Sequence, residues 1–112
     1  MGKKDGGAAL LPGTLEMLVL KTLRRGPTHG YGVAQHIHEA SEGVLTVGEG
    51  SLYPALQRLL ASGCVAAEWG ASAKNRRARY YRLTPAGRKR LGAEMEDFGR
   101  TIGAIARVMQ AP

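Results

Sequence analysis

GSLYPALQRLLASGCVAAEWGASAKNRRARYYRLTPAGRKR (residues 50–90) contains most of what the chain's sequence says about its fold. The stretch begins with an amphipathic helix and continues into two short segments of alternating polarity. The chain has a net charge of +7, and residues 64–92 hold eight basic residues against one acidic residue, Glu68. A basic hairpin beside a surface helix is typical of nucleic-acid binding, although charge alone is equally consistent with a solvated face without a partner.

The helix in this stretch is expected to begin near Gly50 or Ser51 and to end at Gly63. Pro54 would then lie in its first turn, where a missing amide costs no intrahelical hydrogen bond. Small or polar side chains occupy the face opposite the apolar stripe, which consists of Leu52, Ala55, Leu56, Leu59 and Leu60.

Residues 65–69 and 79–83 are expected to form the two strands of a hairpin, joined by a flexible turn (GASAKNRR, 70–77). The alternation places Trp69 on the inner face, where it is expected to join the core. Tyr80 and Tyr81 must point to opposite faces of their strand.

Two more helices are expected before this stretch. Residues 13–25 have apolar residues at helical spacing on more than one face, which indicates burial on two sides. Gly26-Pro27 ends that helix, and Thr28 is expected to cap the next one, which ends at Gly43. Residues 44–47 (VLTV) are expected to form a short strand.

Thr84-Pro85 predicts the start of a last, long helix. Its large apolar residues recur at alternating spacings of three and four, as in a coiled coil. Packing against the chain's own body is the alternative, but a helix of about 35 Å is longer than so small a domain can cover. We therefore predict a homodimer interface at Leu91, Met95, Phe98, Ile102, Ile105 and Met109.

Three helices, a hairpin and a long helix describe a mostly helical α+β fold, the winged helix-turn-helix. We expect a flexible N-terminal tail (1–9), a DNA-binding domain (10–84) and a C-terminal dimerisation helix (85–112). The third helix can enter a major groove about 12 Å wide. The residues expected to contact double-stranded DNA are, on this helix, Ser51, Tyr53, Pro54, Gln57 and Arg58, and, on the hairpin, Lys74, Asn75, Arg76, Arg77 and Arg79.

Each contact has a chemical basis. Arg58 can donate two hydrogen bonds to guanine, and Gln57 can pair with adenine. Ser51 and Tyr53 can donate to phosphates, which position the protein without specifying sequence. The arginines of the hairpin suit phosphates or a narrow minor groove.

The sequence resembles the PadR family of bacterial transcriptional regulators over about residues 10–90. The segments that carry the resemblance are LLPGTLEMLVLKTL, HGYGVAQHI, GSLYPALQRLLASGCV, EWG and RRARYYRLTPAGR, in this order. The resemblance implies a winged-helix dimer, usually a repressor of transcription, whose last helix is swapped across the dimer. It also implies that Ser51, Tyr53, Pro54, Arg58, Asn75, Arg76, Arg77, Arg79 and Tyr80 match functional positions of the family.

The resemblance further implies that effectors can act near the dimer interface. Relatives often have tryptophan where this chain has Phe98, so an aromatic face is kept while the indole N–H donor is lost. A small aromatic effector is expected against Leu15, Leu18 and Phe98. The alternative is that Phe98 packs only against its symmetry mate.

Other classes of function find little support. No apolar stretch approaches the ~20 residues of a membrane span, and the first residues do not form a signal-peptide core, so a cytoplasmic location is expected. The single cysteine, Cys64, is expected to be a small buried apolar residue.

His36 and His38 lie about 200° apart on a helix and His29 is expected at the solvated surface, so no metal or other cofactor is predicted. No set of catalytic residues falls on neighbouring elements, and the chain is not expected to be an enzyme. A winged-helix module that binds an acidic protein surface, or RNA, is the remaining alternative.

Overall fold

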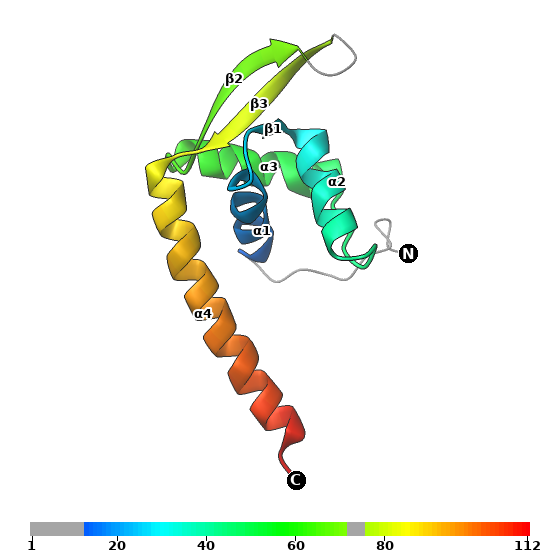
Figure 1. Cartoon of the computed structure of the whole chain (residues 1–112), viewed down its shortest axis with the longest axis vertical. Coiled ribbons are helices and arrows are strands. Elements are labelled where there is room, and N and C mark those ends of the chain that lie inside the picture. The colour runs from blue at the N-terminus through cyan, green and yellow to red at the C-terminus, as the bar shows by residue number, and fades with distance from the viewer. Residues whose placement is uncertain (1–12, 72–75) are drawn as a thin grey trace.

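The fold combines four α-helices with a three-stranded antiparallel sheet (Figure 1), and it is known from a computed structural model that describes residues 13–71 and 76–112. This composition confirms the predicted mostly helical α+β class. None of the described helices is long and apolar enough to cross a lipid bilayer. In chain order the elements are α1 (Thr14–Leu23), β1 (Thr28–His29), α2 (Gly30–Ala40), α3 (Glu49–Ala61), β2 (Val65–Ala71), β3 (Arg77–Leu83) and α4 (Pro85–Gln110).

Helix α1 lies at the centre of the fold and contacts α2, α3, β3 and α4. Burial on two sides, as predicted from its sequence, follows from this position. Leu15 and Leu18 are half-buried at the edge of the core. Thr22 is buried, and its hydroxyl is satisfied because it donates to the Leu18 carbonyl at 2.9 Å. The buried residues of α1 are Met17, Val19, Leu20, Thr22 and Leu23.

Residues 28–29 form the third strand of the sheet, and the prediction of a strand at residues 44–47 was wrong. Thr28 pairs with Tyr81 and His29 with Tyr80, so the strand order is β1-β3-β2. Residues 44–47 instead form the link to α3, where the Leu45 amide donates to the Ser41 hydroxyl at 2.9 Å. This local side-chain bond occupies the backbone group that a strand would need.

The cap of α2 is His29, and the prediction that Thr28 would cap this helix was also wrong. The Nδ1 atom of His29 accepts a hydrogen bond from the Gly32 amide at 3.0 Å, in the way that a shorter polar side chain usually caps a helix. His29 is half-buried rather than solvated. Thr28 lies one residue too early for this role, because α2 begins at Gly30 and its N-cap position is therefore residue 29.

Helix α3 begins at Glu49, one or two residues before the predicted start at Gly50 or Ser51. Pro54 is therefore the sixth residue of the helix and lies beyond the first turn, so the Gly50 carbonyl loses its usual amide donor. Both residues are exposed, and water can satisfy that carbonyl. The helix ends at Ala61, and Gly63, the predicted stop, follows the C-cap with a φ of 76°, a conformation that glycine adopts without strain.

Strands β2 and β3 form a hairpin that projects beyond the helices (Figure 1). At its base, Val65 and Leu83 are paired and buried in the core. Trp69 lies on the same face nearer the tip, where it is paired with Arg79 and 59% exposed. The expectation that Trp69 joins the core was therefore wrong, because burial on β2 fades along the strand toward the tip. Tyr81 is buried as part of the core.

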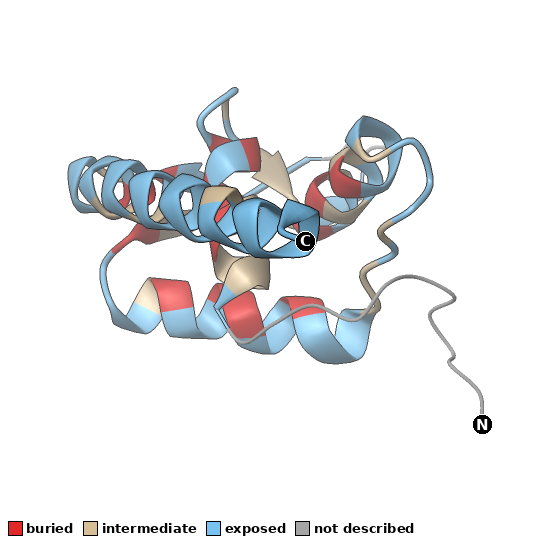
Figure 2. Cartoon of the chain, turned by 90° about the horizontal axis from the view of Figure 1, so that it is seen from below, coloured by how far each residue is buried: buried red, intermediate tan, exposed pale blue. Residues whose placement is uncertain are grey.

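Helix α4 starts at Thr84-Pro85, as predicted: the Thr84 hydroxyl accepts from the Gly87 amide at 3.0 Å. A side chain at Gly87 could not fit, because its Cβ would lie 2.1 Å from the Cys64 carbonyl oxygen. Leu91 is buried in the core of its own chain, which corrects its assignment to the dimer interface. Beyond it the helix runs away from the body and is almost entirely exposed (Figure 2).

Candidate nucleic-acid interface

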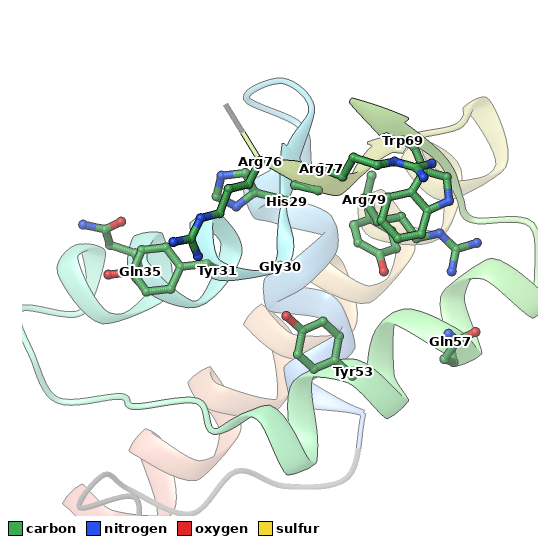
Figure 3. Close-up of a pocket in the computed structure, with 12 residues that line it drawn as sticks. His29, Gly30, Tyr31, Gln35, Tyr53, Gln57, Trp69, Arg76, Arg77 and Arg79 are labelled. Carbon is green, nitrogen blue, oxygen red and sulfur yellow. The ribbon is translucent and has the colours of Figure 1, made fainter. Parts of the chain in front are cut away.

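A cleft of about 830 Å³ lies between the hairpin and helices α2 and α3. Helix α3 contributes Tyr53 and Gln57, which were predicted on its outward side. Figure 3 shows these two side chains below the arginines of the hairpin, with residues of α2 beside them. The described residues that line the cleft include four aromatic side chains and no carboxylate: they are His29, Gly30, Tyr31, Gln35, Tyr53, Gln57, Trp69, Arg76, Arg77, Ala78, Arg79 and Tyr81.

The inner face of the hairpin changes from apolar to cationic toward its tip. Arg77 lies over the ring of Trp69, with its guanidinium carbon 4.7 Å from the ring centre. Arg79 lies over the ring of Tyr81 in the same way, at 6.0 Å. An aromatic face attracts a guanidinium group and leaves its N–H donors available at the edge. These contacts hold the two arginines on the side of the hairpin that faces the cleft.

The structure brings together some of the predicted contact residues and separates others. Tyr53 and Gln57 of α3 line the same cleft as Arg76, Arg77 and Arg79 of the hairpin. Ser51, Pro54 and Arg58 are exposed on α3 but do not line the cleft. Lys74 and Asn75 lie outside the described residues.

Arg58 lies on the flank of α3 that faces α1. Its Nε atom donates to Oε2 of Glu16, while its side chain remains 60% exposed. The other oxygen of Glu16 accepts from Nη2 of Arg90, on α4, at 2.7 Å. Arg90 in turn donates to Glu94 at 2.7 Å. One carboxylate of α1 therefore connects the predicted base-recognising arginine of α3 to the long helix α4.

The charges in this network shift two pKa values in opposite directions. Burial raises the pKa of Glu16, but the hydrogen bonds and positive charges of Arg58 and Arg90 outweigh it, so that the pKa lies below its usual value. The hydrogen bond to Glu94 is the main reason why the pKa of Arg90 is raised, against the opposing effect of burial. Both groups are charged at neutral pH.

Helix α2 also contributes to the cleft, which was not predicted from the sequence. Tyr31 is a large exposed aromatic residue, and Gln35 follows it one turn later on the same side. Gly30 lies where α2 approaches α3, and a Cβ there would lie 3.0 Å from the ring of Tyr53, so a larger residue would make that ring shift. The HGYG segment (29–32) could have indicated this contribution from the sequence, because it combines two aromatic rings with two glycines at the start of a helix.

An apolar row runs along the exposed part of α4. Its members recur at alternating spacings of three and four, so they share one helix face. Phe98 is 43% exposed, Ile102 47% and Ile105 49%, although each is large and apolar. Val108 is a further exposed apolar residue that was not included in the prediction. The row that is free for a partner consists of Met95, Phe98, Ile102, Ile105 and Met109.

These features together define a winged helix-turn-helix protein: α2 and α3 lie beside a hairpin wing, and a long helix follows. Residues 19–93 match the transcriptional regulator PadR-like family. The chain therefore belongs to the PadR-like family of transcriptional regulators, which confirms the resemblance seen in its sequence.

The chain is also similar to individual proteins and solved structures. A transcriptional regulator from Clostridium thermocellum has the same fold, with a TM-score of 0.78 and 27% identity over 85% of this chain and 89% of that one. Bacillus subtilis PadR, solved with operator DNA, has a TM-score of 0.66 at 22% identity over 74% of this chain and 47% of that one, a likeness in fold. An uncharacterized 37.1 kDa protein in transposon TN4556 of Streptomyces fradiae is 40% identical over 90 residues. These residues are 80% of this chain and 24% of that protein, so the chain spans about a quarter of the length of that relative.

Proposed function

We propose that this chain binds double-stranded operator DNA in a sequence-dependent way, acts as a homodimer and represses transcription. The observation that carries the proposal is the cleft between the wing and α3, which has three arginines and no carboxylate among its lining residues in ranges 13–71 and 76–112. A site of this composition attracts a polyanion, and the exposed face of a helix beside it is positioned for a groove.

In the proposed complex, the exposed face of α3 enters the major groove and the wing follows the neighbouring phosphates. Gln57 can contact base edges, because its side chain is exposed and lines the cleft. Arg77 and Arg79 contribute charge and contact phosphates or the minor groove. The complex of Bacillus subtilis PadR with operator DNA supports this mode, because that protein shares the fold.

The homodimer is proposed from the row Met95 to Met109 on α4. In a coiled-coil-like contact the row of one protomer packs against the row of the other, which removes their exposed surface from water. A dimer places two α3 helices in one complex, and a twofold protein recognises a DNA site with twofold symmetry. Repression is proposed from the family: a dimer that covers a promoter excludes the polymerase.

Fluorescence anisotropy with labelled DNA tests the proposal directly. The probes are the DNA upstream of the chain's own coding sequence, a scrambled duplex of equal composition, and an RNA duplex as competitor. We expect tighter binding to the upstream DNA than to the scrambled duplex, and weak competition by RNA. Equal affinity for both DNA duplexes would refute sequence-dependent binding, and preferred binding of RNA would favour the alternative RNA-binding function. Transcription in vitro from the bound promoter tests repression.

A small aromatic effector is proposed as a regulator of this activity, at Phe98 with Leu15 and Leu18. Phe98 presents a partly exposed ring on α4, and the two leucines are half-buried on α1, which contacts α4. An effector changes DNA binding only if it has unequal affinity for the free and DNA-bound states.

A further inference from the structure

Arg58 is held from one side by the carboxylate of Glu16. The bond uses the Nε atom of Arg58 and Oε2 of Glu16. Within the part of the chain that the structure describes, the two terminal Nη nitrogens of Arg58 have no acceptor. A guanidinium group presents its donors in a fixed fork, and terminal nitrogens can donate together to O6 and N7 of a guanine. The contact with Glu16 therefore occupies the Nε–H group and leaves the two terminal nitrogens, with their four N–H groups, for a ligand.

Glu16 is itself held in place. Its side chain is only 12% exposed, and its second oxygen accepts from Nη2 of Arg90 at 2.7 Å. Arg90 is held by Glu94 at 2.7 Å and lies 3.8 Å from the sulfur of Cys64 through Nη1. The carboxylate that meets Arg58 is thus fixed by α1, which carries it, and by α4, which binds its other oxygen.

A fixed acceptor matters because arginine has a long and flexible side chain. Ordering such a side chain when DNA binds reduces affinity, and a side chain that is already oriented avoids part of this cost. The same carboxylate is a negative charge on a protein that must approach phosphates. The charge of Glu16 therefore lowers the affinity for any DNA, whereas its hold on Arg58 raises the affinity for the preferred sequence.

We propose that Glu16 is a positioning residue for base recognition: it orients Arg58 on α3, and Arg90 of α4 keeps Glu16 in place. The inference rests on the proposed function, in which α3 enters the major groove. Recognition of bases then depends on two residues, Glu16 of α1 and Arg58 of α3. It also depends on the position of the first turns of α4, which carry Arg90.

The test compares Glu16→Gln with the wild-type chain on two probes, a duplex selected from a randomised DNA library and a scrambled duplex. The measured quantity is the discrimination ratio, which is the dissociation constant for the scrambled duplex divided by that for the selected duplex. Glu16→Gln should bind the scrambled duplex more tightly, because a negative charge is lost, while its discrimination ratio falls by about two- to fivefold, as expected for an exposed ion pair. Glu42→Gln is the matched control, since Glu42 is exposed and forms no ion pair among the described residues. It should leave the ratio unchanged.

Two further variants separate positioning from a general structural role. In an Arg58→Ala chain, Glu16→Gln should cause no further loss of discrimination, because the side chain that it orients is gone. Arg90→Lys keeps the charge but lacks the fork that binds Glu16 and Glu94 together, so it should reproduce part of the loss. Thermal unfolding of each variant identifies any change that comes from misfolding.

The outcomes distinguish the inference from the function on which it rests. If the wild-type chain has no sequence preference, the proposed function fails and the role of Glu16 fails with it. If Arg58→Ala relaxes the preference while folded Glu16→Gln keeps the full ratio, α3 recognises DNA and the positioning role is wrong. A higher ratio in Glu16→Gln would mean that Glu16 competes with DNA for Arg58, which also overturns the inference.

Discussion

The apolar row on α4 predicts how strongly the dimer is weakened when two of its residues are replaced, and the exposure of these residues gives the magnitude. Ile102 and Ile105 are 47% and 49% exposed in a single chain. Full burial of such a side chain contributes about 1.5–3 kcal/mol, so burying the exposed half contributes about 1 kcal/mol. A symmetric dimer contains each residue twice. Replacing both with aspartate therefore removes about 4 kcal/mol of favourable burial, which is about a thousandfold in the dissociation constant of the dimer. The added charges in an apolar contact increase this loss.

Sedimentation equilibrium measures this effect directly. The wild-type chain should have the mass of a dimer, and Ile102→Asp/Ile105→Asp that of a monomer at the same concentration. Ala93→Asp/Ala104→Asp is the matched control, because it adds the same charge to exposed positions on the opposite face of the helix. The control should remain a dimer. The reasoning is refuted if the wild-type chain is a monomer, or if a folded Ile102→Asp/Ile105→Asp chain keeps the mass of a dimer; circular dichroism establishes the folding.

Three further predictions concern charge, pH and the effector. Arg77→Ala should weaken binding to all DNA duplexes alike and reduce the salt dependence by about one unit in the slope of log K against log salt; an unchanged slope would exclude a phosphate contact. The pKa of Glu16 is lower in the folded chain than its ordinary 4.5, so the bonds to Arg58 and Arg90 stabilise the fold above pH 4.5 and are lost as the pH falls through the folded-state pKa. Urea unfolding should therefore show that Glu16→Gln is less stable than wild type by about 1 kcal/mol near neutral pH and that the difference shrinks in acid; a constant difference would contradict this. Planar aromatic compounds that change DNA affinity should lose that effect in Phe98→Ala, and compounds that act equally on both chains would rule out this effector site.

The local features of the sequence were enough to predict most helices and the hairpin. Thr84-Pro85 predicted the start of α4 because an N-cap hydroxyl and a proline at the first helical position act through neighbouring backbone atoms alone. The positive φ of Gly63 ends α3 for the same kind of local reason. Strand β1 was not predicted, because two residues carry no periodicity and their pairing with β3 joins segments about fifty residues apart.

The candidate site was predicted in composition but not in arrangement. Helical periodicity placed Tyr53 and Gln57 away from the apolar stripe of α3, since that pattern needs only the geometry of one helix. Arg77 was predicted in the turn of the hairpin, whereas it is the first residue of β3. Periodicity could not show that α2 approaches Tyr53 at Gly30 and brings Tyr31 to the cleft, because this contact joins two elements.

The sequence by itself determined the order of the elements, the position of the positive charge and the apolar row of α4, which are all properties of residues that are close in the chain. Only the tertiary structure decided that Leu91 belongs to the core of its own chain, that Trp69 is exposed beneath Arg77, and that Glu16 joins Arg58 to Arg90. The physical reason is that burial and charge pairing depend on which elements meet in space. Glu16 and Arg90 are 74 positions apart in sequence, yet their side chains are 2.7 Å apart, since α1 packs against α4.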